Sequence, residues 1–547
     1  MATAYKRTLD DTTPQACFIE GFFVKDGHTE FVMKVGRGPN PENRWEVQHR
    51  YNDFVTLHSI LQASGFDLPL PPKKVFGNMD SAFIQERRAG LQQYMDAIMS
   101  NRVLANHISV KKFLDPRNYS DEIEKVSQQQ AAMFFRSEPN WELAEPLHDL
   151  GWRIRKQYFV MKSKDSSKNI KRILSWVEYG PDMVLDFETS IPALLRQLTT
   201  LQHPFIYPVE YASCTNKGAT IVRNFHPAGS LKDHLYKAKP LTSNVKKYGG
   251  KVRCPLEFAD VKRCGRQILE ALKFLQDKGW PYGHLHVGNV LVDGQSCRLL
   301  DIENGLLGVP SIYRSYILSM RKIQDMEALN VYCFGHLLYE ITFAEPLNTA
   351  TLDQFPPSCP PQIQPVLHSI LSSSAVKSGL PTIAELISNP LFSDVPVVLQ
   401  EKPSLKVSKL KESLADARDA IESRIKDDQR KLRQFLRLSK AKSEIMSEEE
   451  KKKRKKSVKK KQQSFDETAK PSSAQNSSKR NSVSSPPPPP PQSAPAPPPQ
   501  PPVAPAPSQP TAPTSSKGRG QLLDSISGFS KGKLKKAETN DRSAPKV

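Results

Sequence analysis

The sequence predicts a multidomain α+β protein that ends in a low-complexity tail. Two segments, about 14–120 and 141–395, each place short β-strand patterns before helical ones. Charge is unevenly distributed: residues 451–547 hold 20 Lys and Arg against 5 Asp and Glu, in a chain with a net charge of +21. The basic character therefore belongs mainly to the tail.

Cysteine usage and hydropathy predict the compartment. The seven cysteines stand singly, without a C-x-x-C pair, which predicts reduced thiols. The N-terminal residues lack an apolar segment, and no run reaches the roughly 18 apolar residues of a membrane span. We therefore expect a cytoplasmic protein whose membrane contacts are peripheral.

The first segment, 14–120, has the pattern of a three-stranded sheet followed by helices. Lys25-Asp26-Gly27-His28 supplies turn residues between two strand patterns, which predicts a β-hairpin. Strands are expected at 16–24, 29–35 and 44–51, and helices at 54–65, 81–100 and 102–114.

A basic pocket is expected where the third strand meets the first helix. Arg50 and Tyr51 place a guanidinium and an aromatic ring side by side, and the pairs Lys73-Lys74 and Arg87-Arg88 supply further positive charge nearby in the sequence. A guanidinium can bind a phosphate through two hydrogen bonds, and an aromatic face can support a sugar-like ring. The pattern predicts a phosphoinositide site.

The motifs RYNDF, LPLPPKKVFG and ERRAGLQQYMDAI follow one another in this region, and together they resemble the phox-homology (PX) domain. The resemblance implies that Arg50 binds the 3-phosphate and that Tyr51 lies beneath the inositol ring. It implies that Lys74 is the loop lysine and that Arg87 binds the ring hydroxyls. The implied ligand is phosphatidylinositol 3-phosphate, on endosomal and plasma membranes.

The second segment is preceded by a polar, Gln-rich stretch, 121–140, which we expect to be a linker. Within 141–395, strand patterns come first and long helical patterns later. This order predicts a small β-rich lobe followed by a larger helical lobe.

The stretch YGHLHVGNVLV, with an Asp-Ile-Glu further on, carries the chemistry of this segment. In phosphotransferases an Asp orients the substrate hydroxyl, and a later Asn and Asp hold Mg²⁺. The stretch resembles the protein-kinase catalytic loop, in the variant H-G-D-L-H-x-G-N. The resemblance makes Asn289 and Asp301 candidate Mg²⁺ ligands and places His284 where the catalytic Asp is expected.

Other parts of the kinase pattern are degraded. Glu303 replaces the Gly of D-F-G, and Leu150-Gly151-Trp152-Arg153 stands where the Gly-rich loop is expected. Lys162 in FVMK resembles the ATP-binding lysine, although it also fits a solvent-facing strand position. In a kinase this lysine pairs with a glutamate on a helix of the small lobe. The expected position of that glutamate falls on Leu194, or on Glu188 if the register is shifted. We expect a bilobal, protein-kinase-like fold that is a pseudokinase. No cofactor is expected to be required, and residual binding of ATP and Mg²⁺ stays open.

Residues 396–450 have the leucine and isoleucine spacing of one long amphipathic helix. This helix can pack on the preceding lobe or form a coiled coil, and the sequence leaves both arrangements open. Residues 451–515 form a basic, Pro-rich segment that we expect to be disordered, with 16 prolines between Ser485 and Pro513. Its Lys451–Lys461 run is compatible with a nuclear signal, an RNA patch or a membrane tether, but no nucleic-acid-binding motif accompanies it.

The end of the chain, 516–540, pairs a short amphipathic helix pattern with a basic strip. It resembles the WH2 motif, which implies actin binding, and the proline tract before it suits profilin or SH3 proteins. The expected actin-binding residues are Leu522, Leu523, Ile526, Leu534, Lys535 and Lys536.

The combination resembles a family of kinase-like proteins with a PX domain. This resemblance implies a scaffold that regulates or traffics membrane-protein cargo, with subunits of the sodium pump, Na,K-ATPase, as the candidate. One alternative is an active ATP-dependent serine/threonine kinase with His284 or another group as its base. A second alternative is a protein that acts only on actin.

Overall fold

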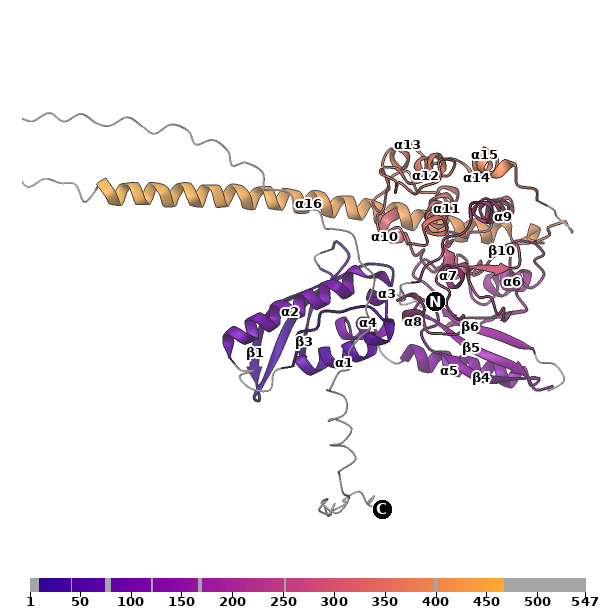
Figure 1. Cartoon of the computed structure of the whole chain (residues 1–547), viewed down its shortest axis with the longest axis horizontal. Helices are drawn as coiled ribbons and strands as arrows, with labels where there is room; N and C mark the ends of the chain where they lie inside the picture. The colour runs from indigo at the N-terminus through magenta and orange to yellow at the C-terminus, as the bar shows by residue number, and fades with distance from the viewer. Residues whose placement is uncertain are drawn as a thin grey trace, which may run out of the picture. The chain divides into compact units, whose positions relative to one another are not determined.

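The computed structural model describes residues 9–40, 42–73, 80–119, 122–165, 170–249, 252–397 and 402–466 (Figure 1). The chain divides into two units, 1–462 and 463–547, and the fold below belongs to the first. It has the expected multidomain α+β organisation. No helix in the described ranges is long and apolar enough to cross a bilayer.

An antiparallel sheet in the order β1-β2-β3 opens the fold. Asp26 and Gly27 both adopt positive φ, +50° and +73°, between the paired residues Lys25 and His28. This is the backbone of a tight two-residue hairpin turn, so the hairpin prediction is confirmed. The strands are β1 (Gln15–Lys25), β2 (His28–Arg37) and β3 (Arg44–Arg50).

Four α-helices and a short 3₁₀ turn follow the sheet and bury its apolar face. Phe54, Leu57 and Leu61 project from one side of the first helix, and Leu91 and its neighbours from the second. Together with β2 they form one hydrophobic core. The elements are α1 (Tyr51–Leu61), η1 (Gln62–Ser64), α2 (Ser81–Ser100), α3 (Arg102–Ala105) and α4 (Ile108–Leu114).

The stretch expected to be a linker is instead mostly a helix, α5 (Glu122–Ser137). Ala131 and Phe134 are buried against strand residues that include Met161 and Leu174. Thr215 donates a hydrogen bond to Gln130 Oε1 at 3.1 Å. The linker expectation was wrong here because a small apolar stripe is enough to dock a largely polar helix.

A five-stranded antiparallel sheet in the order β4-β5-β6-β8-β7 forms the small lobe. α5 covers one face, and α6 (Ser190–Leu198) packs against β7, with its buried leucines in the same hydrophobic core as Val177, Ala219 and Ile221. The strands are β4 (Trp141–Leu147), β5 (Lys156–Ser163), β6 (Lys171–Glu178), β7 (Tyr211–Cys214) and β8 (Gly218–Asn224).

The large lobe is helical and centres on α11 (Met326–Phe343), most of whose side chains are buried. Asn330 on this helix accepts a hydrogen bond from the Gly283 N–H at 2.8 Å, which fixes the start of the catalytic-loop-like segment. The remaining elements are α7 (Leu231–Leu235), α8 (Asn244–Tyr248), α9 (Phe258–Asp277), η2 (Val287–Asn289), β9 (Val290–Asp293), β10 (Ser296–Leu299), α10 (Arg314–Ile317), α12 (Gln364–Leu371), α13 (Ala375–Ser378), α14 (Ile383–Ile387) and α15 (Pro390–Ser393).

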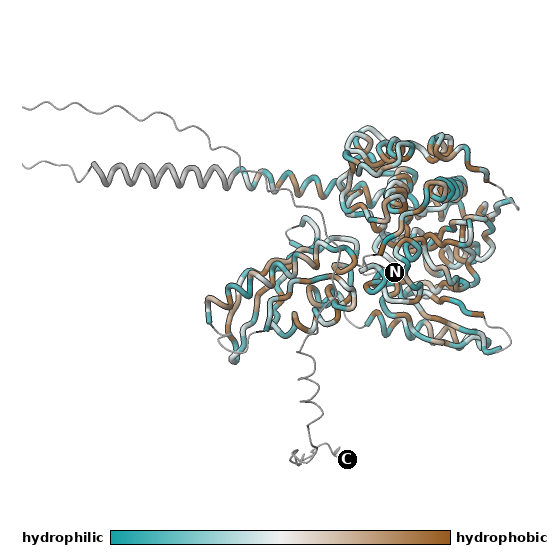
Figure 2. Tube along the Cα trace, viewed as in Figure 1, coloured by the Kyte–Doolittle hydropathy of each residue, from teal (hydrophilic) through white to brown (hydrophobic). Residues whose placement is uncertain are grey.

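The long helix α16 (Lys411–Asp466) follows η3 (Ser408–Leu410) and begins later than expected. Leu414, Ile421 and Ile425 are buried in the core of the helical lobe. Gln429, 1 % exposed, donates hydrogen bonds to three backbone carbonyl oxygens of the lobe. The first part of α16 therefore packs on the lobe, and apolar residues recur among polar ones along it (Figure 2).

Two of the seven cysteines, Cys264 on α9 and Cys297 on β10, form a disulfide with a Cα–Cα distance of 5.6 Å. This differs from the expectation that all thiols are reduced. The two residues are 33 positions apart, and their proximity depends on the packing of β10 against α9.

Candidate functional sites

The first candidate site lies where β3 ends and α1 begins. Arg50 is the N-cap residue of α1, and the Asp53 carboxylate in the first turn accepts a hydrogen bond from the Arg50 backbone N–H at 2.7 Å. Its guanidinium donates from Nε and Nη2 to Glu30 Oε1, each at 3.2 Å. The Arg50 side chain is still 44 % exposed, so Glu30 orients the guanidinium without closing it off from an anion.

Tyr51 and Arg87 meet beside Arg50's helix. The Arg87 guanidinium lies over the Tyr51 ring, 4.1 Å from its centroid, and over Phe83 at 4.4 Å. The Tyr51 hydroxyl donates to the Pro71 carbonyl, and Arg87 donates to the Pro72 carbonyl at 3.3 Å. Burial lowers the pKa of Arg87 and raises that of Tyr51. The structure therefore joins Tyr51, Arg87 and the proline loop in one cluster.

Lys74, the remaining residue predicted for this site, lies outside the described residues. The segment 74–79 separates the proline loop from α2, whose residue Arg87 is in the cluster. The role of Lys74 therefore stays a prediction from the sequence.

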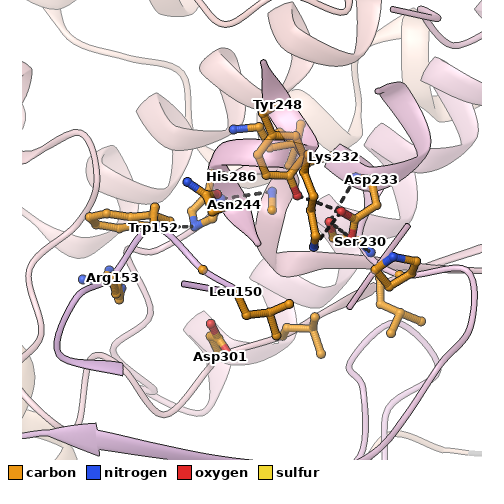
Figure 3. Close-up of a pocket in the computed structure, with 18 of the residues that line it drawn as sticks. Leu150, Trp152, Arg153, Ser230, Lys232, Asp233, Asn244, Tyr248, His286 and Asp301 are labelled. Atoms are coloured by element: carbon orange, nitrogen blue, oxygen red, sulfur yellow. Dashed lines mark hydrogen bonds and ion pairs between the residues drawn. The ribbon is translucent and has the colours of Figure 1, made fainter. Parts of the chain in front are cut away.

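The second candidate site is a cavity of about 260 Å³ between the small and the helical lobe (Figure 3). Apolar groups from both lobes line part of it, including Leu150, Tyr207 and Leu291. Trp152 and Arg153 lie on the segment before β5, and the Arg153 guanidinium is 4.2 Å from the Trp152 ring centroid. This is the segment that stands where a kinase has its Gly-rich loop.

A buried ionic network lies beneath the cavity. Lys156 Nζ on β5 is 2.7 Å from Asp301 Oδ1 and 3.5 Å from Glu303 Oε1. Arg223 on β8 binds Glu303 through both Nη atoms, at 2.6 and 3.3 Å. Burial alone would raise the pKa of Asp301, but Lys156 and Arg223 hold it below its ordinary value. Two cations and two carboxylates thus compensate one another in the interior.

His284 is held as a neutral imidazole. Burial, reinforced by the charge of Arg153, lowers its pKa well below the ordinary value. Arg153 Nη2 lies 3.1 Å from His284 Nδ1, and a guanidinium can only donate, so this nitrogen is the acceptor. A ring nitrogen that already accepts a hydrogen bond from a cation is a poor proton acceptor for a substrate hydroxyl.

The two predicted metal ligands are engaged by protein groups. Asn289 Oδ1 accepts from the His286 N–H at 2.9 Å, and Asn289 Nδ2 donates to the His284 carbonyl at 2.5 Å. Asp301 Oδ1 is bound by Lys156, as described above. Mg²⁺ requires near-octahedral oxygen ligands at about 2.1 Å. Asn289 Oδ1 and Asp301 Oδ1 therefore do not fit Mg²⁺ without displacement of their present partners.

Lys162, the predicted ATP-binding lysine, lies away from the cavity. It is 54 % exposed at the far end of β5 and pairs with Glu142 at 3.0 Å. Lys156 lies on the same face of this strand, six residues earlier, or roughly 20 Å away. The lysine beside Asp301 is therefore Lys156. Strand alternation cannot distinguish the two, because an even spacing places both on one face.

The predicted helical partner of the lysine also differs from the kinase pattern. Leu194 on α6 is fully buried in the apolar core, and Glu188 precedes α6 at an exposed position. The carboxylates that meet Lys156 come instead from Asp301 and Glu303. Sequence reasoning identified Glu303 only as a departure and missed Arg223 entirely.

Comparison with known proteins covers both sites and the tail. The PX domain model matches residues 38–117, and the WH2 motif model matches residues 515–544. The predicted actin-binding residues of the second match, from Leu522 to Lys536, lie outside the described residues. The matches confirm the two motifs that the sequence predicted.

Three relatives show how far the likeness extends. The chain is 49 % identical over 442 residues to the PX domain-containing protein kinase-like protein of Mus musculus, covering 80 % of this chain and 76 % of the relative. It is 38 % identical over 220 residues to the Slowpoke-binding protein of Drosophila melanogaster, 38 % of this chain and 42 % of the relative. It is 30 % identical over 306 residues to the "Probable inactive serine/threonine-protein kinase slob1" of Dictyostelium discoideum, 51 % of each chain.

Proposed function

Because the chain belongs to the family of PX domain-containing protein kinase-like proteins, we propose that it is a pseudokinase scaffold recruited to membranes by phosphoinositides. The observation that carries this proposal is the contrast between its two sites. The PX site keeps an exposed guanidinium and an aromatic–cation cluster, whereas the kinase-like cleft holds a neutral His284 in place of the catalytic carboxylate. One site is built to bind an anion, and the other has lost its base.

The lipid that we propose is phosphatidylinositol 3-phosphate, which places the protein on the cytoplasmic side of endosomal membranes. Arg50 would bind the 3-phosphate, Tyr51 would lie beneath the inositol ring, and Arg87, next to Tyr51, would bind the ring hydroxyls. Lys74, from the adjoining loop, would complete the site. Several weak charge-assisted contacts that converge on one headgroup give selectivity that a single surface arginine lacks.

The cargo that we propose is an integral membrane protein. One relative is named for binding Slowpoke, and the resemblance of the sequence suggests subunits of Na,K-ATPase as a further candidate. The WH2 motif would couple the complex to actin, and the proline tract would recruit profilin or SH3 proteins. In this arrangement the kinase-like domain is a docking module and transfers no phosphate.

The lipid step is tested by sedimentation of the full chain with liposomes that contain single phosphoinositides. We expect binding to phosphatidylinositol 3-phosphate that Arg50→Gln weakens at least about tenfold, because one charge-assisted hydrogen-bonding group contributes about 1.5–3 kcal/mol. Lys34→Gln is the matched control, since Lys34 is an exposed cation of the same sheet that pairs with Glu20. Equal binding of wild type and Arg50→Gln would falsify the assignment of the site.

A further inference from the structure

The charged side chains that line the cavity of the kinase-like cleft are mostly cations. Five lysines and arginines face three carboxylates, so the lining has a formal excess of two positive charges. Burial raises the pKa of Glu340 and lowers the pKa of Lys232, so it disfavours the charged form of both groups. The lining cations are Arg102, Arg153, Arg223, Lys232 and Lys247, and the carboxylates are Asp233, Asp301 and Glu340.

Four of these eight groups, Arg223, Lys247, Asp233 and Asp301, have an ionic partner. Arg223 pairs with Glu303, Asp301 with Lys156, and Lys247 with Asp233 at 2.9 Å. Arg102 donates to the Ile312 carbonyl at 2.9 Å.

Arg153 and Lys232 stand apart from these ion pairs, as does Arg102, whose guanidinium lies over the Tyr313 and Tyr316 rings. Arg153 donates to the neutral His284 and to the Pro310 carbonyl, and Lys232 Nζ lies 4.2 Å from the Tyr248 ring centroid. In the described part of the chain, no carboxylate oxygen lies within 4.0 Å of either cation. Burial lowers the pKa of Arg153 to about 10, which leaves it charged at neutral pH.

The cleft therefore reverses the electrostatics of a metal-dependent nucleotide site. Such a site offers carboxylate and amide oxygens to Mg²⁺, which then binds the phosphates. Here the corresponding oxygens of Asn289 and Asp301 are engaged by a backbone N–H and by Lys156. A phosphate group in this cleft would therefore meet the positive charge of lysine and arginine side chains and not that of a metal ion.

We propose that the cleft binds a nucleoside phosphate without a divalent metal ion, with Arg153 and Lys232 as the phosphate-binding residues. The apolar part of the cavity, including Leu150, Tyr207 and Leu291, suits an aromatic base. The two cations lie on opposite lobes, one before β5 and one on α7 (Figure 3). A ligand that binds both would hold the lobes together, and this role goes beyond membrane recruitment.

The test is the thermal unfolding of the full chain with ATP, with inorganic triphosphate and with adenosine, each in EDTA and in MgCl₂. A ligand that binds only the folded state raises the Tm. We expect ATP to raise the Tm equally in both buffers, MgCl₂ alone to have no effect, and adenosine and triphosphate to give smaller shifts. An ATP effect that requires Mg²⁺, or no ATP effect in either buffer, contradicts the proposal.

Substitutions identify the binding groups. Lys232→Met keeps the length of the side chain and removes its charge, so we expect the Kd for ATP to rise about tenfold or more. Lys162→Met is the matched control, because Lys162 is exposed on β5 and lies outside the cavity. An unchanged Kd in Lys232→Met overturns the assignment. Liposome binding of the same protein is measured in parallel, so that a failure here is distinguished from a failure of the proposed recruitment.

Discussion

At the residue scale, the replacement of the catalytic carboxylate by His284 is accompanied by changes in the residues around it. Its Nδ1 accepts a hydrogen bond from Arg153, and the adjoining Asp301 is neutralised by Lys156. A carboxylate placed at 284 would pair with Arg153 and would still lack a metal-bound phosphate to act on. The loss of the base is therefore only one of several coupled changes in the cleft.

We expect His284→Asp to leave phosphotransfer undetectable, because the substitution restores the base and none of the groups that position the phosphate. The measurement is transfer of radiolabelled phosphate from ATP to a generic protein substrate and to the chain itself. A matched preparation of an active kinase defines the detection limit. Measurable transfer by His284→Asp would show that the base was the decisive loss.

A different, partly buried histidine, His203, predicts a pH dependence of stability. Burial lowers its pKa from an ordinary value near 6.5 to about 4, and its Nδ1 accepts from the Phe205 N–H at 3.1 Å. Between these values the unfolded chain binds the proton and the folded chain does not, so stability is lost as the pH falls from about 6.5 to 4. The full effect is roughly 3 kcal/mol.

The expected contribution is measured by urea denaturation of wild type and His203→Asn over this pH range. Asn keeps a side-chain acceptor for the Phe205 N–H but does not titrate. The difference in unfolding free energy between the two proteins should therefore shrink or reverse in favour of the variant at low pH. Parallel pH profiles for the two proteins would exclude His203 as a source of the acid sensitivity.

At the scale of elements, the sequence predicted the features that depend on residues close to one another in the chain. The Asp26-Gly27 hairpin followed from residues that tolerate positive φ, and α16 followed from its apolar spacing. α5 was missed because its buried stripe centres on Ala131 and Phe134 within a Gln-rich sequence. The choice of Lys156 over Lys162 depends on which end of β5 meets the helical lobe, which strand periodicity cannot express.

The packing of α16 gives a prediction with an internal control. Ile425 is 2 % exposed in the core of the helical lobe, whereas Leu436, on the same helix, is 58 % exposed. Ile425→Ala should cost about 2–5 kcal/mol of stability through lost burial and a residual cavity, and Leu436→Ala should change it by less than about 0.5 kcal/mol. Chemical denaturation of the full chain measures both. Similar losses in the two variants would mean that Leu436 is also covered in solution.

At the scale of the whole molecule, the chain combines a PX domain, a WH2 motif and a kinase-like cleft for which we propose a third kind of ligand. The PX site presents the exposed Arg50 beside the buried Arg87, the proposed phosphate site in the kinase-like cleft consists of partly buried cations, and the WH2 match combines apolar residues with a basic strip. Because binding energies of distant, independent sites add, each unit should be removable without loss of the others. This separability distinguishes a scaffold from a protein that acts only on actin.

Deletion of 516–540 is therefore expected to abolish co-sedimentation with actin, because it removes Leu522, Leu534 and the basic residues beside it. Arg50-dependent liposome binding should persist at wild-type affinity. Deletion of 486–510 is the matched control, since it removes 25 residues of the proline tract and leaves the WH2 match intact. If the 516–540 deletion also ended liposome binding, the tail would take part in membrane recruitment, and the units could not be independent.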